Sequence, residues 1–158
     1  AVNWYRKAAE QGSADAAYKL AFCYLKGMGV PAKSEKDAAT WYLKAAEQGL
    51  PDAEYALGEM YYGGQGVGQN YGDAVKWYTA AANHGHSAAQ FRLGGCYALG
   101  QGVSARDLVE AYKWYILSAA QGEEKAVDKR DNYPTLNKLS PGQIAEGKKR
   151  AETFVVKK

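Results

Sequence analysis

The dipeptide Trp-Tyr occurs four times at nearly constant spacing, and this recurrence restricts the chain to a repeat architecture. The pairs begin at Trp4, Trp41, Trp77 and Trp114, so the steps between them are 37, 36 and 37 residues. Ala precedes each Trp by three residues, and Gly follows it by eight. A fixed period of roughly 20–50 residues is the signature of a repeat protein. We therefore treat the chain as an array of repeats.

Each repeat has the pattern of two helices. In residues 50–85, Ala53, Leu57 and Tyr61 are four residues apart, which places them on one helix face. The glycine-rich run 63–68 predicts the end of that helix, since Gly adopts positive φ without strain. The stripe of the second helix follows, formed by Ala74, Trp77, Tyr78, Ala81 and Ala82. Capping residues are expected to open the second helices, namely Ser34, Asn70 and Ser104.

Stacked repeats bury the apolar faces that a single helix pair leaves exposed. The sequence therefore predicts an all-α solenoid of antiparallel helix pairs, in which Trp, Tyr and Leu fill the space between helices. A repeat array is expected over residues 1–122 and a cap over residues 123–158. Within the array we expect a truncated half repeat and three full repeats, at 1–12, 13–49, 50–85 and 86–122.

The cap is expected where the repeat pattern stops. Arg130 and Pro134 stand where earlier repeats have Leu and Tyr. Ser140-Pro141-Gly142-Gln143 then predicts a capping box and a final helix over roughly residues 141–156. The residues expected to cover the open end of the stack are Ile144, Ala151, Phe154 and Val155. A solenoid needs such an atypical terminal unit to stay soluble.

The charge distribution argues against a nucleic-acid reader. Residues 1–122 contain 11 Lys and Arg and 11 Asp and Glu, so the whole formal charge of +3 comes from residues 123–158. A nucleic-acid-binding surface usually carries a dense basic face. No apolar stretch reaches the ~18 residues of a membrane span, and no signal peptide is recognisable. The chain begins without Met and inside an expected helix, so we expect a missing N-terminus and leave the compartment open.

Residues typical of a reactive centre are scarce. His84 and His86 form the only histidine pair, and zinc needs three or four ligands. Cys23 and Cys96 occupy equivalent positions two repeats apart, too far for a disulfide, so both are expected to be buried thiols. Neither the S-x-x-K motif nor a P-loop is present. We expect no catalytic residue, no metal site and no cofactor.

The repeating pattern A-x-x-L-G-x-x-Y-x-x-G-x-G-V, followed by A-x-x-W-Y-x-x-A-A-x-x-G, resembles the Sel-1-like repeat family. The resemblance covers residues 1–122, and the segment 137–144 is similar to the C-terminal caps of bacterial members. It implies an α/α right-handed superhelix, related to tetratricopeptide repeats, that serves as a non-enzymatic adaptor for other proteins. A hydrolase or small-ligand protein using the same groove is the alternative, and an RNA-binding helical repeat is a third reading.

The resemblance also implies where a partner would bind. In the tetratricopeptide relatives, the first helix of each repeat lines the concave face. Carried over to this chain, that face would contain Asp15, Tyr18, Phe22, Lys26, Asp52, Tyr55, Glu59, Tyr62, Phe91 and Asp128. Tyr18, Tyr55 and Phe91 are equivalent, and they would either line the groove as an aromatic row or pack between helices. A protein or peptide partner is expected, and self-association through residues 1–12 is a further expectation.

Overall fold

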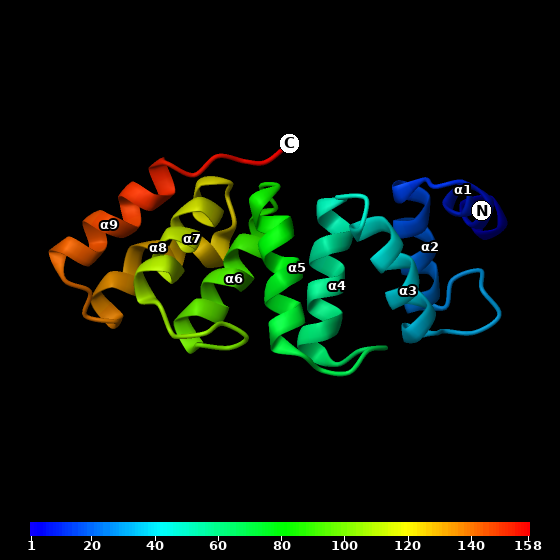
Figure 1. The fold of residues 1–158 in the computed structure, drawn as a ribbon, viewed down its shortest axis with the longest axis horizontal. Helices are drawn as coiled ribbons and strands as arrows, with labels where there is room; N and C mark the ends of the chain where they lie inside the picture. The colour runs from blue at the N-terminus through cyan, green and yellow to red at the C-terminus, as the bar shows by residue number, and fades with distance from the viewer. The chain divides into compact units, whose positions relative to one another are not determined.

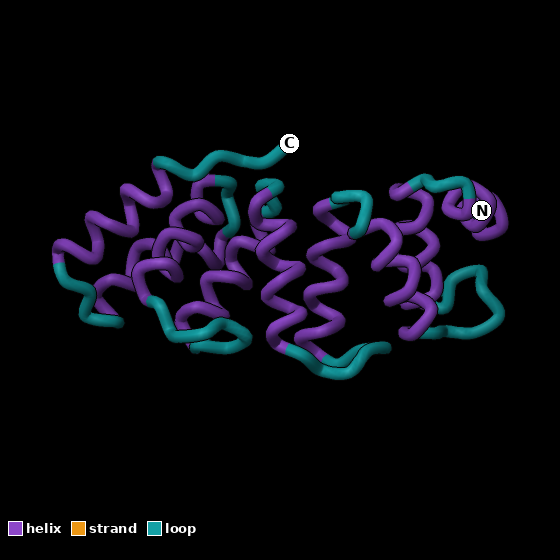
Figure 2. The backbone as a smooth tube through the Cα atoms, in the orientation of Figure 1, coloured by secondary structure: helices purple, strands orange, loops and turns teal.

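The computed structural model describes residues 1–158 as nine α-helices without a strand (Figures 1 and 2). The chain divides into two compact units, residues 1–80 and residues 81–158. No helix has the length and apolar character needed to cross a membrane. The helices are α1 (Val2–Glu10), α2 (Ala14–Lys26), α3 (Glu35–Ala46), α4 (Pro51–Gly63), α5 (Tyr71–Asn83), α6 (Ser87–Leu99), α7 (Leu108–Ala120), α8 (Glu124–Leu136) and α9 (Pro141–Glu152). The all-α fold predicted from the sequence is confirmed.

Glycines end the first helix of each repeat, as the sequence predicts. Gly64, which caps α4, adopts φ 69° and ψ 35°, and its N–H donates to the carbonyl of Met60. Gly27 and Gly100 cap α2 and α6 in the same left-handed conformation. A side chain at these positions would be strained, because L-residues rarely adopt this region. The glycines therefore define where the first helices stop.

The second helices begin at side-chain caps in a constant register. Ser34 Oγ accepts from the Asp37 N–H, and Asn70 Oδ1 accepts from the Asp73 N–H. In the third repeat the cap is Asp107, whose Oδ1 accepts from the N–H groups of the second and third residues after it. The prediction of Ser104 was therefore wrong. Asp107 keeps the spacing of 36–37 residues from the other caps, and Ser104 lies in the preceding loop.

Small residues bring the helices of residues 1–80 close together. Ala16, Ala38 and Ala53 are almost completely buried, and Leu20 and Leu57 fill the space between them. Gly58 of α4 lies against a ring of α5, since a Cβ there would come within 2.6 Å of Cδ1 of Tyr78. Such close approach explains why Ala and Gly recur at fixed positions in the repeats.

In the second unit, α6 packs on α7 and α7 packs on both α8 and α9. Two buried polar side chains connect the start of α6 to its neighbours. Ser118 Oγ donates to the Ser87 carbonyl at 2.8 Å, and Gln90 Nε2 donates to the Ala82 carbonyl at 3.1 Å. Both side chains are at least 99% buried, so these hydrogen bonds satisfy groups that water cannot reach. They fix α6 relative to α7 and to the segment before α6.

In three of the four Trp-Tyr pairs the Tyr is buried, while Tyr5 of the first pair is half-buried. Tyr42, Tyr78 and Tyr115 are at most 3% exposed. Trp114 is also buried, because the Phe154 ring covers it at a centroid distance of 5.3 Å. Trp4 is 68% exposed, so the expectation that every Trp fills space between helices was wrong for this residue. Self-association through this part of the chain stays a prediction.

The C-terminal helix is shorter than expected and lies on α7. It ends at Glu152 rather than near residue 156, and Val155 is 78% exposed rather than covering other residues. The segment after α9 is not helical and packs on other parts of the second unit. Phe154 contacts Trp114, and the Lys157 N–H donates to the Asn83 carbonyl at 2.7 Å. Figure 1 shows this segment running back over α7. The predicted capping box at Ser140 is confirmed.

Candidate functional site

The equivalent aromatic residues of the first helices pack against the second helix of their own repeat. Each ring lies 5.4–6.1 Å from a buried tyrosine, in the pairs Tyr18–Tyr42, Tyr55–Tyr78 and Phe91–Tyr115. All three first-helix rings remain half-buried. Packing anchors one side of each ring, while the other side stays on the surface of the first helices. The interpretation that these rings pack between helices thus has support in all three repeats, whereas an aromatic row lining a groove stays a prediction.

In residues 1–80, the predicted partner-binding residues lie on α2 and α4. Burial raises the pKa of Tyr18 in α2, and the Asp52 carboxylate in the first turn of α4 adds to that rise. Phe22 is 40% exposed, and the Lys26 ammonium lies 5.8 Å from its ring centroid. Asp15 is exposed in the first turn of α2. The structure thus places charged and aromatic groups together on these two first helices.

The remaining predicted residues of this unit, Glu59 and Tyr62, lie on α4 and contact side chains of α5. The Tyr78 hydroxyl donates to the Glu59 carboxylate, and the Tyr62 ring lies 5.1 Å from the Tyr71 ring. Both residues are half-buried. A separate hollow of about 310 Å³ near the end of α2 includes Lys26 but none of the other predicted residues. These contacts hold the side chains in place at the surface of α4.

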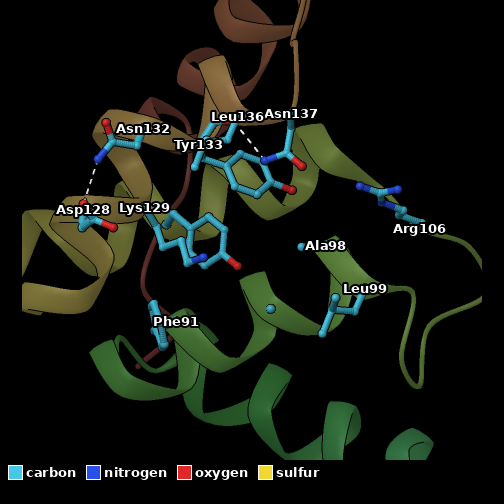
Figure 3. A pocket seen from close by; sticks show the side chains of 12 residues that line it. Phe91, Ala98, Leu99, Arg106, Asp128, Lys129, Asn132, Tyr133, Leu136 and Asn137 are labelled. Atoms are coloured by element: carbon cyan, nitrogen blue, oxygen red, sulfur yellow. Dashed lines mark hydrogen bonds between the residues drawn. The ribbon is translucent and has the colours of Figure 1, made fainter.

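In residues 81–158, the first helices α6 and α8 line a cavity of about 380 Å³, which we call the α6–α8 cavity (Figure 3). It contains Phe91 and Asp128 from the predicted set. The Tyr115 ring reaches it from α7, and Arg106 reaches it from the loop before α7. Its full lining is Phe91, Gly95, Ala98, Leu99, Arg106, Tyr115, Asp128, Lys129, Asn132, Tyr133, Leu136 and Asn137. Apolar and charged groups therefore line one cavity that is open to the surface.

Two amides of the cavity are already hydrogen-bonded. Asn132 Nδ2 donates to Asp128 Oδ1 at 2.7 Å, and Asn137 Nδ2 donates to the Tyr133 carbonyl at 3.0 Å (Figure 3). The Tyr133 hydroxyl is buried and has no hydrogen-bond partner. Burial raises the pKa of Tyr133 to about 12, with the nearby Arg106 opposing that rise and Asp107 adding to it. One oxygen of the Asp128 carboxylate therefore has a hydrogen-bond partner, whereas the Tyr133 hydroxyl has none.

Several cavity residues were not in the predicted set. Lys129, Tyr133 and Leu136 are separated by four and three residues, which places them on one face of α8. That periodicity was available in the sequence, although the loss of the repeat pattern after residue 122 obscured it. No sequence signal identifies Arg106, because it lies in a loop whose path depends on how α6 and α7 pack. Such a loop residue joins a site only through tertiary structure.

The histidine pair and the cysteines have structural surroundings. His86 is the N-cap of α6, where its Nδ1 accepts from the Ala89 N–H at 3.2 Å. Cys23 and Cys96 are both buried thiols, as expected. No group of three or more His, Cys, Asp or Glu side chains is arranged to hold a metal ion.

The comparison with protein families agrees with this arrangement of helix pairs. The model of the Sel1 repeat matches residues 1–13, 14–50, 51–86 and 87–123. The chain belongs to the Sel1 repeat family. Sel1 repeats generally mediate protein–protein interactions, and proteins of the family are typically non-enzymatic scaffolds. The resemblance seen in the sequence is thereby confirmed, while the boundary between array and cap stays a prediction.

Solved structures of Sel1 repeat proteins have the same fold. A Sel1 repeat protein from Oxalobacter formigenes is 39% identical with a TM-score of 0.75, and the match covers 81% of this chain and 95% of that one. A protective antigen of uropathogenic Escherichia coli with this repeat fold is 30% identical with a TM-score of 0.71. That match covers 97% of this chain but only 40% of the antigen.

A more distant structure shares the fold alone. Cysteine-rich protein B of Helicobacter pylori is 21% identical with a TM-score of 0.62, over 80% of this chain and 95% of that one. A comparison with curated protein sequences finds no significant match. The structural relatives therefore establish the architecture and the family.

Proposed function

We propose that this chain is a non-enzymatic scaffold that binds a peptide or protein segment on the face lined by the first helices of its repeats. In residues 1–80 that face is formed by α2 and α4, and in residues 81–158 by α6 and α8. The α6–α8 cavity is the observation that carries the proposal. Its volume of about 380 Å³ lies within the range of ~300–1,000 Å³ typical of ligand pockets.

Exposed apolar side chains beside the cavity support a protein partner. Leu99 is 69% exposed and Leu136 is 75% exposed, although both are large and apolar. They belong to α6 and α8 and line the same cavity as the half-buried Phe91. Apolar anchors surrounded by polar groups are typical of sites where a peptide inserts side chains.

The surface of α2 and α4 offers similar chemistry. Tyr18 and Tyr55 are held by their packing, so their outer sides are rigid aromatic surfaces. Phe22 and Lys26 add an exposed ring and a cation, and Asp15 and Asp52 add carboxylates. Rigid aromatic groups bind peptides with little loss of side-chain entropy. These residues make α2 and α4 the second surface on which we expect a partner to bind.

A hydrolase or small-ligand protein is the alternative that the cavity volume alone would also suit. The carboxylate of the cavity, Asp128, accepts a hydrogen bond from Asn132. General acid–base catalysis usually combines two titratable groups beside the substrate, and the cavity lining has a single carboxylate and no histidine. The exposed leucines at the cavity rim fit a segment of polypeptide better. We therefore favour binding of a protein segment.

Selection from random peptide libraries tests the proposal. One library presents peptides with a free C-terminus, and the other presents the same peptides as internal segments. The double variant Leu99→Ala, Leu136→Ala removes the two exposed leucines of the cavity. The matched control, Val155→Ala, Val156→Ala, removes two exposed apolar residues outside it.

We expect the wild type and the control to enrich peptides that the leucine variant no longer retains. Both variants should keep the circular dichroism spectrum of the wild type, since all four side chains are at least half exposed. The proposal is contradicted if neither library yields a peptide, or if the leucine variant retains the same peptides as the wild type.

A further inference from the structure

Arg106 differs from every other arginine of the chain. It reaches the α6–α8 cavity and forms no ion pair or hydrogen bond. The four other arginines, which are Arg6, Arg92, Arg130 and Arg150, all have an interaction partner. A guanidinium offers five N–H donors in a planar arrangement that suits a carboxylate. The one arginine whose donors are unused thus lies at the candidate binding site.

A second cation of the cavity is also available. Lys129 of α8 is exposed and has no ion pair, whereas the one carboxylate of the lining, on Asp128, is engaged by Asn132. The lining therefore holds two cations and one carboxylate, while the nearby Asp107 carboxylate accepts backbone N–H groups at the start of α7. Charge complementarity then favours an anionic group as the ligand.

The Tyr133 hydroxyl is a third unused donor at the same place. Tyr133 is 4% exposed, and its hydroxyl lacks a hydrogen-bond partner. The ring projects from α8 toward Arg106 (Figure 3), and the guanidinium is near enough to influence the hydroxyl. A buried polar group without a partner is unfavourable, so an acceptor arriving beside Arg106 would supply what is missing.

The apolar part of the same cavity narrows the choice of anion. Phe91, Leu99 and Leu136 line the space that Arg106 and Lys129 also line. A phosphate or an acidic side chain brings negative charge without an apolar group attached to the same carbon. The C-terminal residue of a protein carries its carboxylate and its side chain on one Cα, so an apolar C-terminal residue satisfies both halves of the cavity.

We propose that the α6–α8 cavity recognises the C-terminal residue of a partner protein. Arg106 and Lys129 bind its carboxylate with the Tyr133 hydroxyl as a further donor, and Phe91, Leu99 and Leu136 contact its apolar side chain. This inference rests on the proposed function, because it names the part of the partner that enters the cavity.

Small probes of one residue test the inference without knowledge of the partner. The 158-residue chain, labelled with ¹⁵N, is titrated with N-acetyl-L-leucine and followed by amide chemical shifts. N-acetyl-L-leucinamide has the same side chain without the charge. N-acetyl-L-glutamic acid α-amide carries its carboxylate on the side chain instead. With N-acetyl-L-leucine we expect saturable changes in the amide chemical shifts of Gly95, Asn132 and Asn137. The other two probes should bind at least about tenfold more weakly.

Charge-removing variants locate the carboxylate. Arg106→Gln and Lys129→Gln should each weaken binding of N-acetyl-L-leucine severalfold, whereas binding of the leucinamide should not change. Lys125→Gln is the matched control, because Lys125 is an exposed lysine of α8 outside the cavity lining. Tyr133→Phe tests the third donor and should weaken only the binding of the free acid.

If the free acid and the leucinamide bind equally well, the cavity does not recognise a carboxylate. If the glutamate probe binds as well as N-acetyl-L-leucine, the cavity does not recognise a C-terminal residue. Failure of all three probes to shift cavity amides would overturn the inference as a whole. A different outcome would contradict the proposed function: the cavity binds N-acetyl-L-leucine, but neither peptide library yields a bound peptide. Peptides selected equally as internal segments support the proposed function but overturn recognition of a C-terminus.

Discussion

Gly94 of α6 lies directly against the ring of Tyr115 in α7. A Cβ at residue 94 would come within 2.8 Å of Cε1 of Tyr115 and 3.2 Å of the Ala111 carbonyl oxygen. The next residue, Gly95, has open space, since the nearest atom to its Cβ would be Tyr115 Oη at 4.0 Å. Two adjacent glycines in one helix therefore have different roles.

Gly94→Ala should lower the free energy of unfolding by about 1–3 kcal/mol, because an added methyl group overpacks the contact with Tyr115. Gly95→Ala should raise it by up to ~1 kcal/mol, since Ala favours a helix interior more than Gly does. Urea denaturation of both variants measures the difference. Equal effects of the two substitutions would show that the close contact does not determine stability.

Arg150 connects α9 to α7. Its Nη1 lies 3.0 Å from Glu110 Oε2, and its Nε lies 2.9 Å from Glu146 Oε1. Arg150 is 39% exposed, so Arg150→Ala should cost no more than about 1 kcal/mol. Hydrogen exchange should accelerate in α9 more than in α6. Lys148→Ala is the control on the same helix, and a similar acceleration in that variant would argue against the specific role of Arg150.

The same contact predicts a dependence on acid pH. The hydrogen bond from Arg150 holds the pKa of Glu146 below its ordinary value of 4.5. Because the pKa of Glu146 is lower in the folded chain, its carboxylate stabilises the fold at pH values above the unfolded-state pKa. This contribution is lost as the pH falls through the folded-state pKa. An NMR titration should find the Glu146 pKa lowered in the wild type and higher in Arg150→Ala. An unchanged Glu146 pKa in the variant would contradict the assignment.

Buried tyrosines predict a loss of stability at alkaline pH. Burial raises the pKa of Tyr42 and Tyr115 far above the ordinary value of 10.0, and that of Tyr133 to about 12. A raised pKa means that the folded chain binds the proton more tightly, so stability is complete below pH ~10 and falls as the pH rises toward 12 and beyond. Tyrosinate absorbance near 295 nm should rise late, together with the loss of helical circular dichroism. Complete ionisation near pH 10 with the fold intact would contradict this.

The unsatisfied hydroxyl of Tyr133 gives a test of stability that needs no ligand. Tyr133→Phe should leave the free energy of unfolding unchanged or raise it by about 1 kcal/mol, because it removes a buried group that lacks a partner. Tyr24→Phe is the contrasting variant. It removes the hydroxyl that accepts from Arg6 Nη2 at 2.8 Å, so it should lower stability by ~0.5–1.5 kcal/mol. Thermal unfolding of both variants decides the matter.

Much of the fold was predictable because the repeats encode it locally. Gly64 requires a left-handed backbone, Ser34 and Asn70 supply side-chain caps, and Pro51 occupies the first turn of α4. Each of these signals acts within a few residues. The error at Ser104 came from a loop with two candidate caps, and the register of the other repeats identifies Asp107.

The candidate site was predictable only in part. Phe91 and Asp128 line the α6–α8 cavity, and their positions follow from the spacing of the first helices. The C-terminal segment was less predictable. Val155 is as apolar as Phe154, yet Phe154 covers Trp114 while Val155 is exposed. Composition cannot distinguish them, because the distinction depends on the direction in which the chain leaves α9.

The sequence alone determined the repeat, the all-α fold and the glycine ends of the first helices, because each depends on periodicity or on the backbone preference of one residue. Only the tertiary structure decided which groups share the α6–α8 cavity. Arg106 from a loop, Tyr115 from α7 and Tyr133 from α8 belong to three different elements and carry no common pattern. They meet because the packing of α7 on α6 and α8 sets where their side chains end, and that packing is a property of the assembled helices.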